Sequence, residues 1–193
     1  MTNSAQAQMR QPKYDEQKTT QAAALLLRLN GAPMPYMKLV KLLYNIDREA
    51  LRRWGRPITN DTVFSLPHGL ILSITLDKAE TSDPVTPTYW DQHLATKGYR
   101  VSLVADCDDG ELSDAEIELI TEFFAHYKDK SQFDMEKEHH NPLLFPEWKD
   151  PGNSRIETHA ADILRALGLT PEEIEDAVTR IDEDAHLHAY LST

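Results

Sequence analysis

One helix constrains the fold of this chain more than any other segment. Between Pro35 and Gly55, apolar side chains recur at the three- and four-residue spacing of a helix face: Leu39, Leu42, Leu43, Ile46 and Ala50. Proline suits the first turn of a helix, and glycine commonly follows the last turn. The pattern therefore predicts a helix over residues 35–54 whose apolar face lies in the core.

Two more helices are predicted from the residues at their ends. A helix over residues 14–30 is closed by Gly31, because glycine readily adopts the left-handed conformation that ends a helix. Ser113 and Glu116 form a capping box, in which the hydroxyl and the carboxylate each accept from a free backbone N–H group. This box predicts a third helix, which carries aliphatic and aromatic side chains near one face.

The C-terminal part of the chain has two further helix starts. Ser154 and Glu157 have the spacing of a second capping box, which predicts a helix ending at Gly168. Thr170 followed by Pro171 has the order of an N-cap and a first helical residue. We therefore expect a last helix after Gly168.

Strands are predicted in two places. Residues 62–66 read as a short strand, after which Pro67-His68-Gly69 turns the chain into a helix near residues 70–80. A Thr-, Ser- and Pro-rich loop follows at residues 81–87. Residues 99–104 form a second predicted strand that can pair with the first. The predicted fold class is mainly α: a compact helical domain with a small antiparallel β element.

The length and composition predict one folded domain with short additions. Of the 193 residues, 40% are hydrophobic, which is enough to build a core. We expect residues 1–12 to be a disordered lead-in, residues 13–168 to form the helical domain, and residues 169–193 to add a C-terminal helix. That helix is interpreted as a partner-binding or dimer element.

The charge is divided unevenly along the chain. Residues 1–60 hold 10 Lys or Arg and 4 Asp or Glu, whereas residues 61–193 hold 10 and 28, within a total net charge of -12. An acidic body repels phosphate backbones, so a protein or small-molecule partner is favoured over nucleic acid. The alternative reading is that the acidic helix faces only keep the protein soluble.

Several features favour a cytoplasmic protein without a membrane segment. No apolar run approaches the roughly 18–20 residues that span a bilayer. The first eleven residues lack the apolar core of a secretory signal. Cys107 is the single cysteine, which excludes a disulfide within the chain and fits a reducing compartment.

The sequence predicts no catalytic or cofactor-binding residues. It contains no Gly-x-Ser-x-Gly elbow, no Ser-x-x-Lys and no glycine-rich phosphate loop. Its 32 carboxylates offer no acid–base pair that sequence alone identifies. We therefore predict that the protein is not an enzyme, while the alternative of an enzyme on a helical scaffold would require a bound metal or cofactor.

Metal binding is also disfavoured. His186 and His188 are two residues apart on a predicted helix and point to different faces, unlike the i,i+4 pairs of helical zinc sites. Glu136, Glu138 and His140 are close enough in sequence to share a divalent cation. Carboxylates on a solvated helix face are the commoner situation, so no metal ligands are assigned.

Polar residues flank the apolar face of the helix at 35–54. We expect Asp47 with Arg48 to clamp the Gly55–Thr59 turn or the Pro67–Gly69 bend. The ring nitrogens of His68 are expected to fix that bend. A structural polar network is favoured over a catalytic role, because buried polar groups need partners.

A winged-helix-like DNA-binding regulator is the alternative function. A short turn at residues 30–33 precedes a basic helix, and a pair of strands follows it like a wing. DNA would then be approached by the basic residues of this helix: Lys38, Lys41, Arg48, Arg52 and Arg53. The leucines of the same helix are committed to the core, which leaves few positions to read bases.

Three ordered motifs resemble a known family. They are Lys-Leu-Leu-Tyr-x-x-Asp-Arg at 41–48, Gly-Arg-Pro-Ile-Thr at 55–59 and Pro-His-Gly at 67–69, followed by Trp148. Their order and spacing resemble the Panacea domain, the SocA-like antitoxin domain, over roughly residues 14–168. The residues of this chain that carry the resemblance are Lys41, Leu42, Leu43, Tyr44, Asp47, Arg48, Gly55, Arg56, Pro57, Pro67, His68, Gly69 and Trp148.

The resemblance implies a bacterial or phage antitoxin that neutralises its cognate toxin by direct protein–protein contact. It also implies a mostly helical domain without catalytic residues, whose motifs build the fold. Partner binding is assigned to the acidic start of the last helix: Glu172, Glu173, Glu175 and Asp176. A basic toxin would suit this acidic surface, and a homodimer stays open.

Overall fold

The computed structural model describes residues 13–31, 33–81 and 86–191. The predicted lead-in at residues 1–12 and part of the predicted loop at 81–87 lie outside these ranges. The helices are α1 (Glu16–Asn30), α2 (Tyr36–Trp54), α3 (Ser73–Glu80), α4 (Tyr89–His93), α5 (Asp114–Tyr127), α6 (Gln132–His139), α7 (Ala160–Ala166) and α8 (Pro171–Leu191). The strands are β1 (Met34–Pro35), β2 (Val63–Leu66), β3 (Gly69–Leu72), β4 (Leu94–Lys97), β5 (Arg100–Leu103) and β6 (Ile156–Glu157). The fold is mainly α with a small antiparallel β component, which confirms the predicted class.

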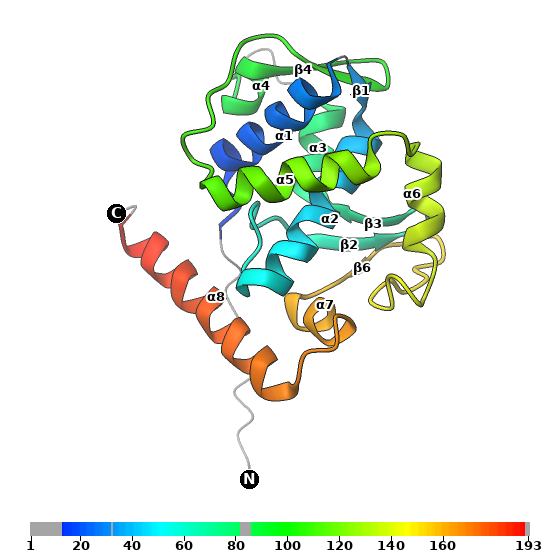
Figure 1. The fold of residues 1–193 in the computed structure, drawn as a ribbon, viewed down its shortest axis with the longest axis vertical. Helices are drawn as coiled ribbons and strands as arrows, with labels where there is room; N and C mark the ends of the chain where they lie inside the picture. The colour runs from blue at the N-terminus through cyan, green and yellow to red at the C-terminus, as the bar shows by residue number, and fades with distance from the viewer. Residues whose placement is uncertain (1–12, 32, 82–85, 192–193) are drawn as a thin grey trace.

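The helix predicted between Pro35 and Gly55 is the centre of the molecule. α2 contacts α1, α3, α5, α6 and α7 as well as β1 and β3, and these elements surround it in Figure 1. It ends at Gly55, whose φ of 70° lies in the left-handed region. Because α2 has neighbours on nearly every side, polar residues such as Lys41, Asn45 and Asp47 are buried with its leucines. The helix therefore needs polar partners from other parts of the chain.

The helices next to α2 begin and end as their cap residues predict. The side chain of Asp15 accepts from the backbone N–H of Lys18 at the start of α1, and Gly31 ends this helix with a φ of 64°. The capping box of Ser113 and Glu116 opens α5. α1, α2 and α5 contact one another pairwise. Together they form the main helical layer.

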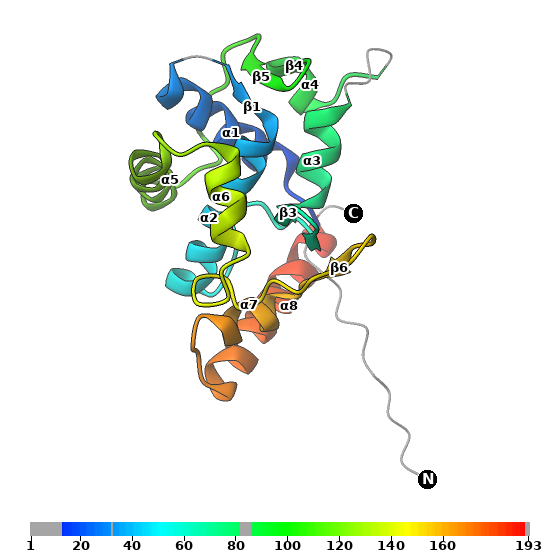
Figure 2. The same cartoon turned by 90° about the vertical axis from the view of Figure 1, so that its right-hand side faces the viewer.

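The two sheets lie in separate parts of the molecule. β5 is the middle strand of the order β1-β5-β4, and β2 is the middle strand of the order β3-β2-β6. Figure 2 shows β4 and β5 at one end beside α4, and β3 and β6 further down the molecule. The prediction that residues 99–104 pair with residues 62–66 is therefore wrong, because β5 pairs with β1 and β4 instead.

Residues 69–72 form a strand where the sequence predicts the start of a helix. Gly69 pairs with Leu66 and Leu72 with Val63, so β2 and β3 make a tight hairpin. All four residues of β3 are buried, so the strand lacks the polar–apolar alternation of a half-exposed strand. α3 begins only at Ser73, directly after this strand.

The second predicted capping box does not open a helix. Ile156 and Glu157 pair with β2 as β6, and α7 begins at Ala160 after His159. The N–H of Thr158 donates to the carbonyl of Val63 at 2.9 Å, so this segment continues the sheet edge. Pairing with β2 therefore prevails over the local helix signal.

The last helix packs on the rest of the chain along one face. α8 contacts α7, and the buried side chain of Ala177 approaches Gly55 at the end of α2. Ile174, Val178 and Ile181 are partly buried against the same core. Figure 1 shows α8 beside α7 and crossing the end of α2. No helix among the described residues is long and apolar enough to cross a bilayer.

Candidate functional site

Two motif residues of α2 bind one buried carboxylate. Tyr44 Oη donates to Glu147 Oε1 at 2.7 Å, and Arg48 Nε donates to the same oxygen at 2.5 Å. The guanidinium also donates to the carbonyl of Leu144 at 3.0 Å and lies 4.8 Å from the ring centroid of Phe145. Burial, with the nearby negative charge of Glu147, raises the pKa of Tyr44. The paired charges of Arg48 and Glu147 thus fix residues 144–147 on α2.

A second polar cluster holds the bend at residues 67–69. Lys41 Nζ donates to the carbonyl of His68 at 2.6 Å, and His139 Nδ1 accepts from the N–H of Leu70 at 3.2 Å. His139 Nε2 lies 3.0 Å from Asn45 Oδ1, so it carries the ring proton and donates it. Burial, followed by the charge of Lys41, lowers the pKa of His139 well below its ordinary value.

The ring of His68, which the sequence suggests as the group that fixes the bend, makes an exposed contact there. The His68 side chain is 75% exposed, and its Nδ1 lies 3.0 Å from Glu136. Burial lowers the pKa of Lys41 to about 8, and the negative charge of Glu136 opposes this shift. The His68 ring therefore joins the bend to α6 through an exposed contact, and its backbone carbonyl accepts from the buried Lys41.

Glycine is required at position 69. Its φ of 102° lies in the region that side chains disfavour. A Cβ atom at this position would lie 2.8 Å from the Cβ of His139 and 2.9 Å from Lys41 Nζ. The Pro-His-Gly motif thus allows the chain to pass directly over the Lys41–His139 contact.

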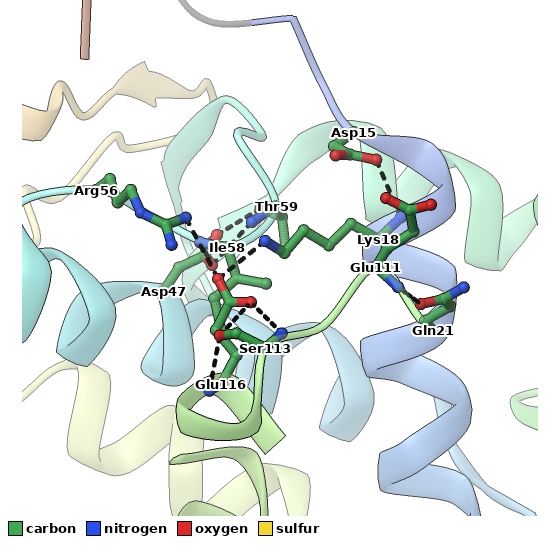
Figure 3. A network of polar contacts seen from close by, with 10 residues as sticks. All are labelled: Asp15, Lys18, Gln21, Asp47, Arg56, Ile58, Thr59, Glu111, Ser113 and Glu116. Atoms are coloured by element: carbon green, nitrogen blue, oxygen red, sulfur yellow. Dashed lines mark hydrogen bonds and ion pairs between the residues drawn. The ribbon is translucent and has the colours of Figure 1, made fainter. Parts of the chain in front are cut away.

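Asp47 binds the turn that follows α2. Its Oδ1 accepts from the N–H groups of Ile58 at 2.8 Å and Thr59 at 3.1 Å, and its Oδ2 accepts from the Thr59 hydroxyl (Figure 3). These contacts join Asp47 to the Gly55–Thr59 turn rather than to the bend at 67–69. Burial raises the pKa of Asp47 to about 7, and the hydrogen bonds oppose this shift.

Arg56, from the motif at 55–59, belongs to a separate cluster of charged side chains. Arg56 Nη1 lies 3.3 Å from Glu116 Oε1, and Lys18 Nζ lies 2.9 Å from the same oxygen (Figure 3). Glu116 also caps α5 through Ser113. Its buried carboxylate therefore links α1, α5 and the turn after α2, and both cations stabilise its charge.

The remaining motif residues complete the same structural framework. Trp148 Nε1 donates to the carbonyl of Leu66 at 3.1 Å, which attaches the end of the loop after α6 to the β2–β3 hairpin. Leu42 and Leu43 lie in the core. Pro67 is exposed in the hairpin turn, and Pro57 lines a cavity described next.

A cavity of about 90 Å³ lies between α2, β2, α7 and α8. Its apolar lining comes from Leu51, Pro57, Val63, Ala160, Ala161, Ile163, Val178 and Ile181. Asp47, Asp61 and Asp182 also line it. Asp61 Oδ2 accepts from the N–H of Thr75 at 2.7 Å and from its hydroxyl at 2.6 Å, and burial raises the pKa of this carboxyl. The sequence alone does not reveal this site, because its walls are far apart in the chain.

The residues predicted to bind a partner lie at the exposed start of α8. Glu173 accepts from the N–H of Thr170 at 2.8 Å, so it caps the helix, and these hydrogen bonds lower its pKa. Glu172, Glu175 and Asp176 are exposed, and none has an ion pair within 4 Å among the described residues. These three carboxylates are available for an external partner.

The basic residues that the alternative function requires are engaged within the protein. Lys38 Nζ donates to the carbonyl of Lys128 at 2.8 Å, and Lys41 is buried. Arg52 and Arg53 both pair with Glu49, and Arg53 also pairs with Glu122. With Arg48 bound to Glu147, this set does not form an open basic surface, which disfavours the DNA-binding reading.

The acidic and histidine residues considered as metal ligands are dispersed. Glu136 pairs with His68, Glu138 with Lys130, and His140 packs on Trp148. Among the described residues, no three His, Cys, Asp or Glu side chains are placed to hold a metal ion. The side chains of His186 and His188 lie outside what the structure describes.

The fold and this buried framework define a mainly α domain organised around one central helix, α2, which buries polar residues together with its leucines. The family model described as antitoxin SocA-like, Panacea domain, matches residues 39–149. This range is more than half of the chain, and the chain belongs to this family. The match is narrower than residues 14–168, since α1, α7 and α8 lie beyond it. No curated protein and no solved structure matches the chain.

Proposed function

We propose that this protein is the antitoxin of a toxin–antitoxin pair and neutralises its cognate toxin by binding it directly. Membership of the antitoxin SocA-like family is the observation that carries the proposal. Its action is binding rather than catalysis, because the polar motif groups are used in internal contacts. Cys107 is a buried free thiol, which fits action in the cytoplasm.

The motif residues support this role by building the fold. Lys41, Tyr44 and Asp47 are buried and hydrogen-bonded to other parts of the chain. Their hydrogen-bonding atoms are engaged within the chain, so these side chains offer a partner little open surface. The toxin contact therefore belongs on the surface, for which the exposed Glu172, Glu175 and Asp176 of α8 are the best candidates. Residues 61–193, with 28 acidic and 10 basic residues, suit a basic toxin.

The first experiment identifies the partner. The protein is purified with an affinity tag from its native host at about 150 mM salt, where contacts between exposed charges are partly screened. Mass spectrometry identifies a stoichiometric partner, which is then expressed alone and together with this protein. We expect growth inhibition by the partner alone and recovery on coexpression. A partner that does not inhibit growth, or inhibition that coexpression does not relieve, overturns the antitoxin proposal.

A second experiment tests the docking surface with matched variants. Glu172→Gln, Glu175→Gln and Asp176→Asn are combined in one variant, and Asp77→Asn, Glu111→Gln and Glu118→Gln in the control. Each removes three exposed negative charges. We expect toxin affinity to fall about tenfold in the α8 variant, about 1.4 kcal/mol in total, and to stay unchanged in the control. Equal affinities in both variants would remove α8 from the interface and leave the antitoxin role intact.

Substitution is a sharper test than truncation at Gly168. Deleting α8 would remove the buried Ala177 and the partly buried Ile174, Val178 and Ile181, and would expose the core beneath them. Loss of binding would then have two explanations. Changing only the outer carboxylates leaves this packing in place. Size-exclusion chromatography of the same variants also tests whether α8 forms a homodimer contact.

A further inference from the structure

The cavity between α2, β2, α7 and α8 combines apolar walls with acidic groups. Leu51, Val63 and Ile163 contribute aliphatic surface from three elements, and Val178 and Ile181 close it from α8. Its volume of about 90 Å³ is several times the ~10–15 Å³ that one water needs, but it is far below the ~300 Å³ of a site for a drug-sized ligand. The space suits a single extended side chain.

Two carboxylates of this cavity, Asp47 and Asp61, differ from the buried Glu116 and Glu147 in having no cationic side chain at ion-pair distance among the described residues. Glu116 pairs with Lys18 and Arg56, and Glu147 pairs with Arg48. Within the described ranges, no Lys, Arg or His nitrogen lies within 4 Å of the carboxylates of Asp47 and Asp61. Their partners are backbone N–H groups and threonine hydroxyls instead.

Burial without a counter-charge is unfavourable for a carboxylate. It raises the pKa of both Asp47 and Asp61, and the negative charge of Asp61 raises the pKa of Asp47 further. Arg48 also lines the cavity, but its guanidinium is bound to Glu147. A cation placed beside these two aspartates would therefore gain favourable electrostatic energy that no Lys, Arg or His side chain in the described ranges supplies there.

We propose that the cavity receives one arginine or lysine side chain of the toxin. The aliphatic walls take its methylene groups, and Asp47 and Asp61 face its cationic end. Arginine is the better fit, because a guanidinium is more weakly hydrated than an ammonium and is favoured at buried ion pairs. The inference rests on the proposed antitoxin function and names the chemistry of one contact within it.

A fragment experiment tests the chemistry without the toxin. The full chain is titrated with n-butylguanidinium, n-butylammonium and, as the neutral control, n-butanol, while methyl NMR signals of Val63, Ile163, Val178 and Ile181 are followed. Both cations are expected to shift these signals at millimolar concentrations, as befits ligands of few atoms. Binding of n-butanol with the same affinity, or no shift with either cation, overturns the proposal.

Two variants locate the binding. Asp61→Asn removes the charge and keeps an oxygen that accepts from Thr75, and Ala161→Phe fills the cavity without changing charge. Asp77→Asn and Ala115→Phe are the controls, because both positions are exposed and lie outside the cavity. We expect each cavity variant to weaken n-butylguanidinium binding at least tenfold and each control to leave it unchanged. Thermal unfolding of all four verifies that they are folded.

The same variants are then tested against the toxin from the copurification experiment. We expect Asp61→Asn and Ala161→Phe each to lower toxin affinity about tenfold, with the controls unchanged. Toxin affinity that is unchanged in folded cavity variants overturns the inference, whereas the antitoxin function stands because the toxin still binds. If the variants lose n-butylguanidinium but keep the toxin, the cavity belongs to a free organic amine and the assignment to a toxin side chain is overturned.

Discussion

Two neighbouring residues of α2, Arg48 and Asp47, illustrate two ways of burying charge in this protein. Arg48 faces Glu147, and the two opposite charges meet at 2.5 Å. Asp47 faces the Gly55–Thr59 turn and the cavity, where its charge meets only hydrogen-bond donors. One side of the helix is electrostatically complete within the chain, and the other is not.

Within the motif at 41–48, this difference separates a charge that is paired inside the chain from one that has no counter-charge among the described residues. The Arg48–Glu147 side ties residues 144–147 to α2 and has no unused charge. The Asp47 side also holds a turn, but it leaves acidic oxygens next to an open apolar space. A motif that builds the fold can therefore still place one of its charged groups at the wall of a cavity.

Removing the cation from the paired side is expected to have the largest effect. Arg48→Ala leaves the fully buried Glu147 carboxylate without its counter-charge. We expect the free energy of unfolding to fall by about 3–5 kcal/mol in urea titrations. Arg52→Ala is the control, because its pair with Glu49 is half exposed and is worth about 0–1 kcal/mol. Similar losses in both variants would show that the Arg48–Glu147 pair is not the main stabilising contact.

Disturbing the close backbone approach on the same side has the next largest effect. In Gly69→Ala the new Cβ meets His139 and Lys41, and the backbone keeps a φ that alanine disfavours. We expect a loss of about 2–4 kcal/mol in the free energy of unfolding. Gly31→Ala has a left-handed φ but open space, so it should lose only about 1–2 kcal/mol. Equal losses would mean that backbone strain alone decides the effect.

The unpaired side is tested by the pH dependence of stability. Burial raises the pKa of Asp47 to about 7, above the value of about 3.9 in an unfolded chain. The folded protein thus binds this proton more tightly, so the stabilisation is complete below about pH 4 and is lost as the pH rises through 7. We expect the wild type to lose at least ~1 kcal/mol more than Asp47→Asn between pH 5 and pH 8 in urea titrations.

Other ionisable groups line the same cavity, so the comparison needs a reference. Tyr44, Arg48, Asp61, His159 and Asp182 are present in both proteins, so the difference between wild type and variant reports the titration of Asp47 together with its coupling to Asp61. Asp77→Asn, at an exposed position of α3, serves as the control and should follow the wild type. A wild type and an Asp47→Asn variant with parallel pH profiles would contradict the raised pKa.

The sequence predicts the elements whose signals are local. α1, α2 and α5 are found from Gly31, from Pro35 and Gly55, and from the Ser113 box, because each of these signals acts within one turn of its helix. The same reasoning fails at Ser154, whose spacing to Glu157 is correct but whose neighbour Ile156 pairs with β2. Pairing with a strand about ninety residues away leaves no mark in the local sequence.

In the candidate site, too, local features can be predicted from the sequence and long-range contacts cannot. Lys41, Asp47 and Arg48 are recognisable as polar positions of a mostly apolar helix, and a structural network follows from that pattern. Their partners are less visible, because Glu147 and His139 lie about a hundred residues further along the chain. The cavity is a property of four packed elements, so sequence patterns do not locate it.

The smallest effect is expected for His68→Ala, which is compared with His139→Ala at the same bend. His139 is buried and bonds to Leu70 and Asn45, so His139→Ala leaves two buried polar groups unsatisfied and is expected to cost about 2–5 kcal/mol. The ring of His68 is largely exposed beside Glu136, so His68→Ala should change the free energy of unfolding by less than about 1 kcal/mol. Both are measured by urea titration at pH 7.5. A large loss in His68→Ala would show that its imidazole, and not only its backbone carbonyl, holds the bend over Lys41.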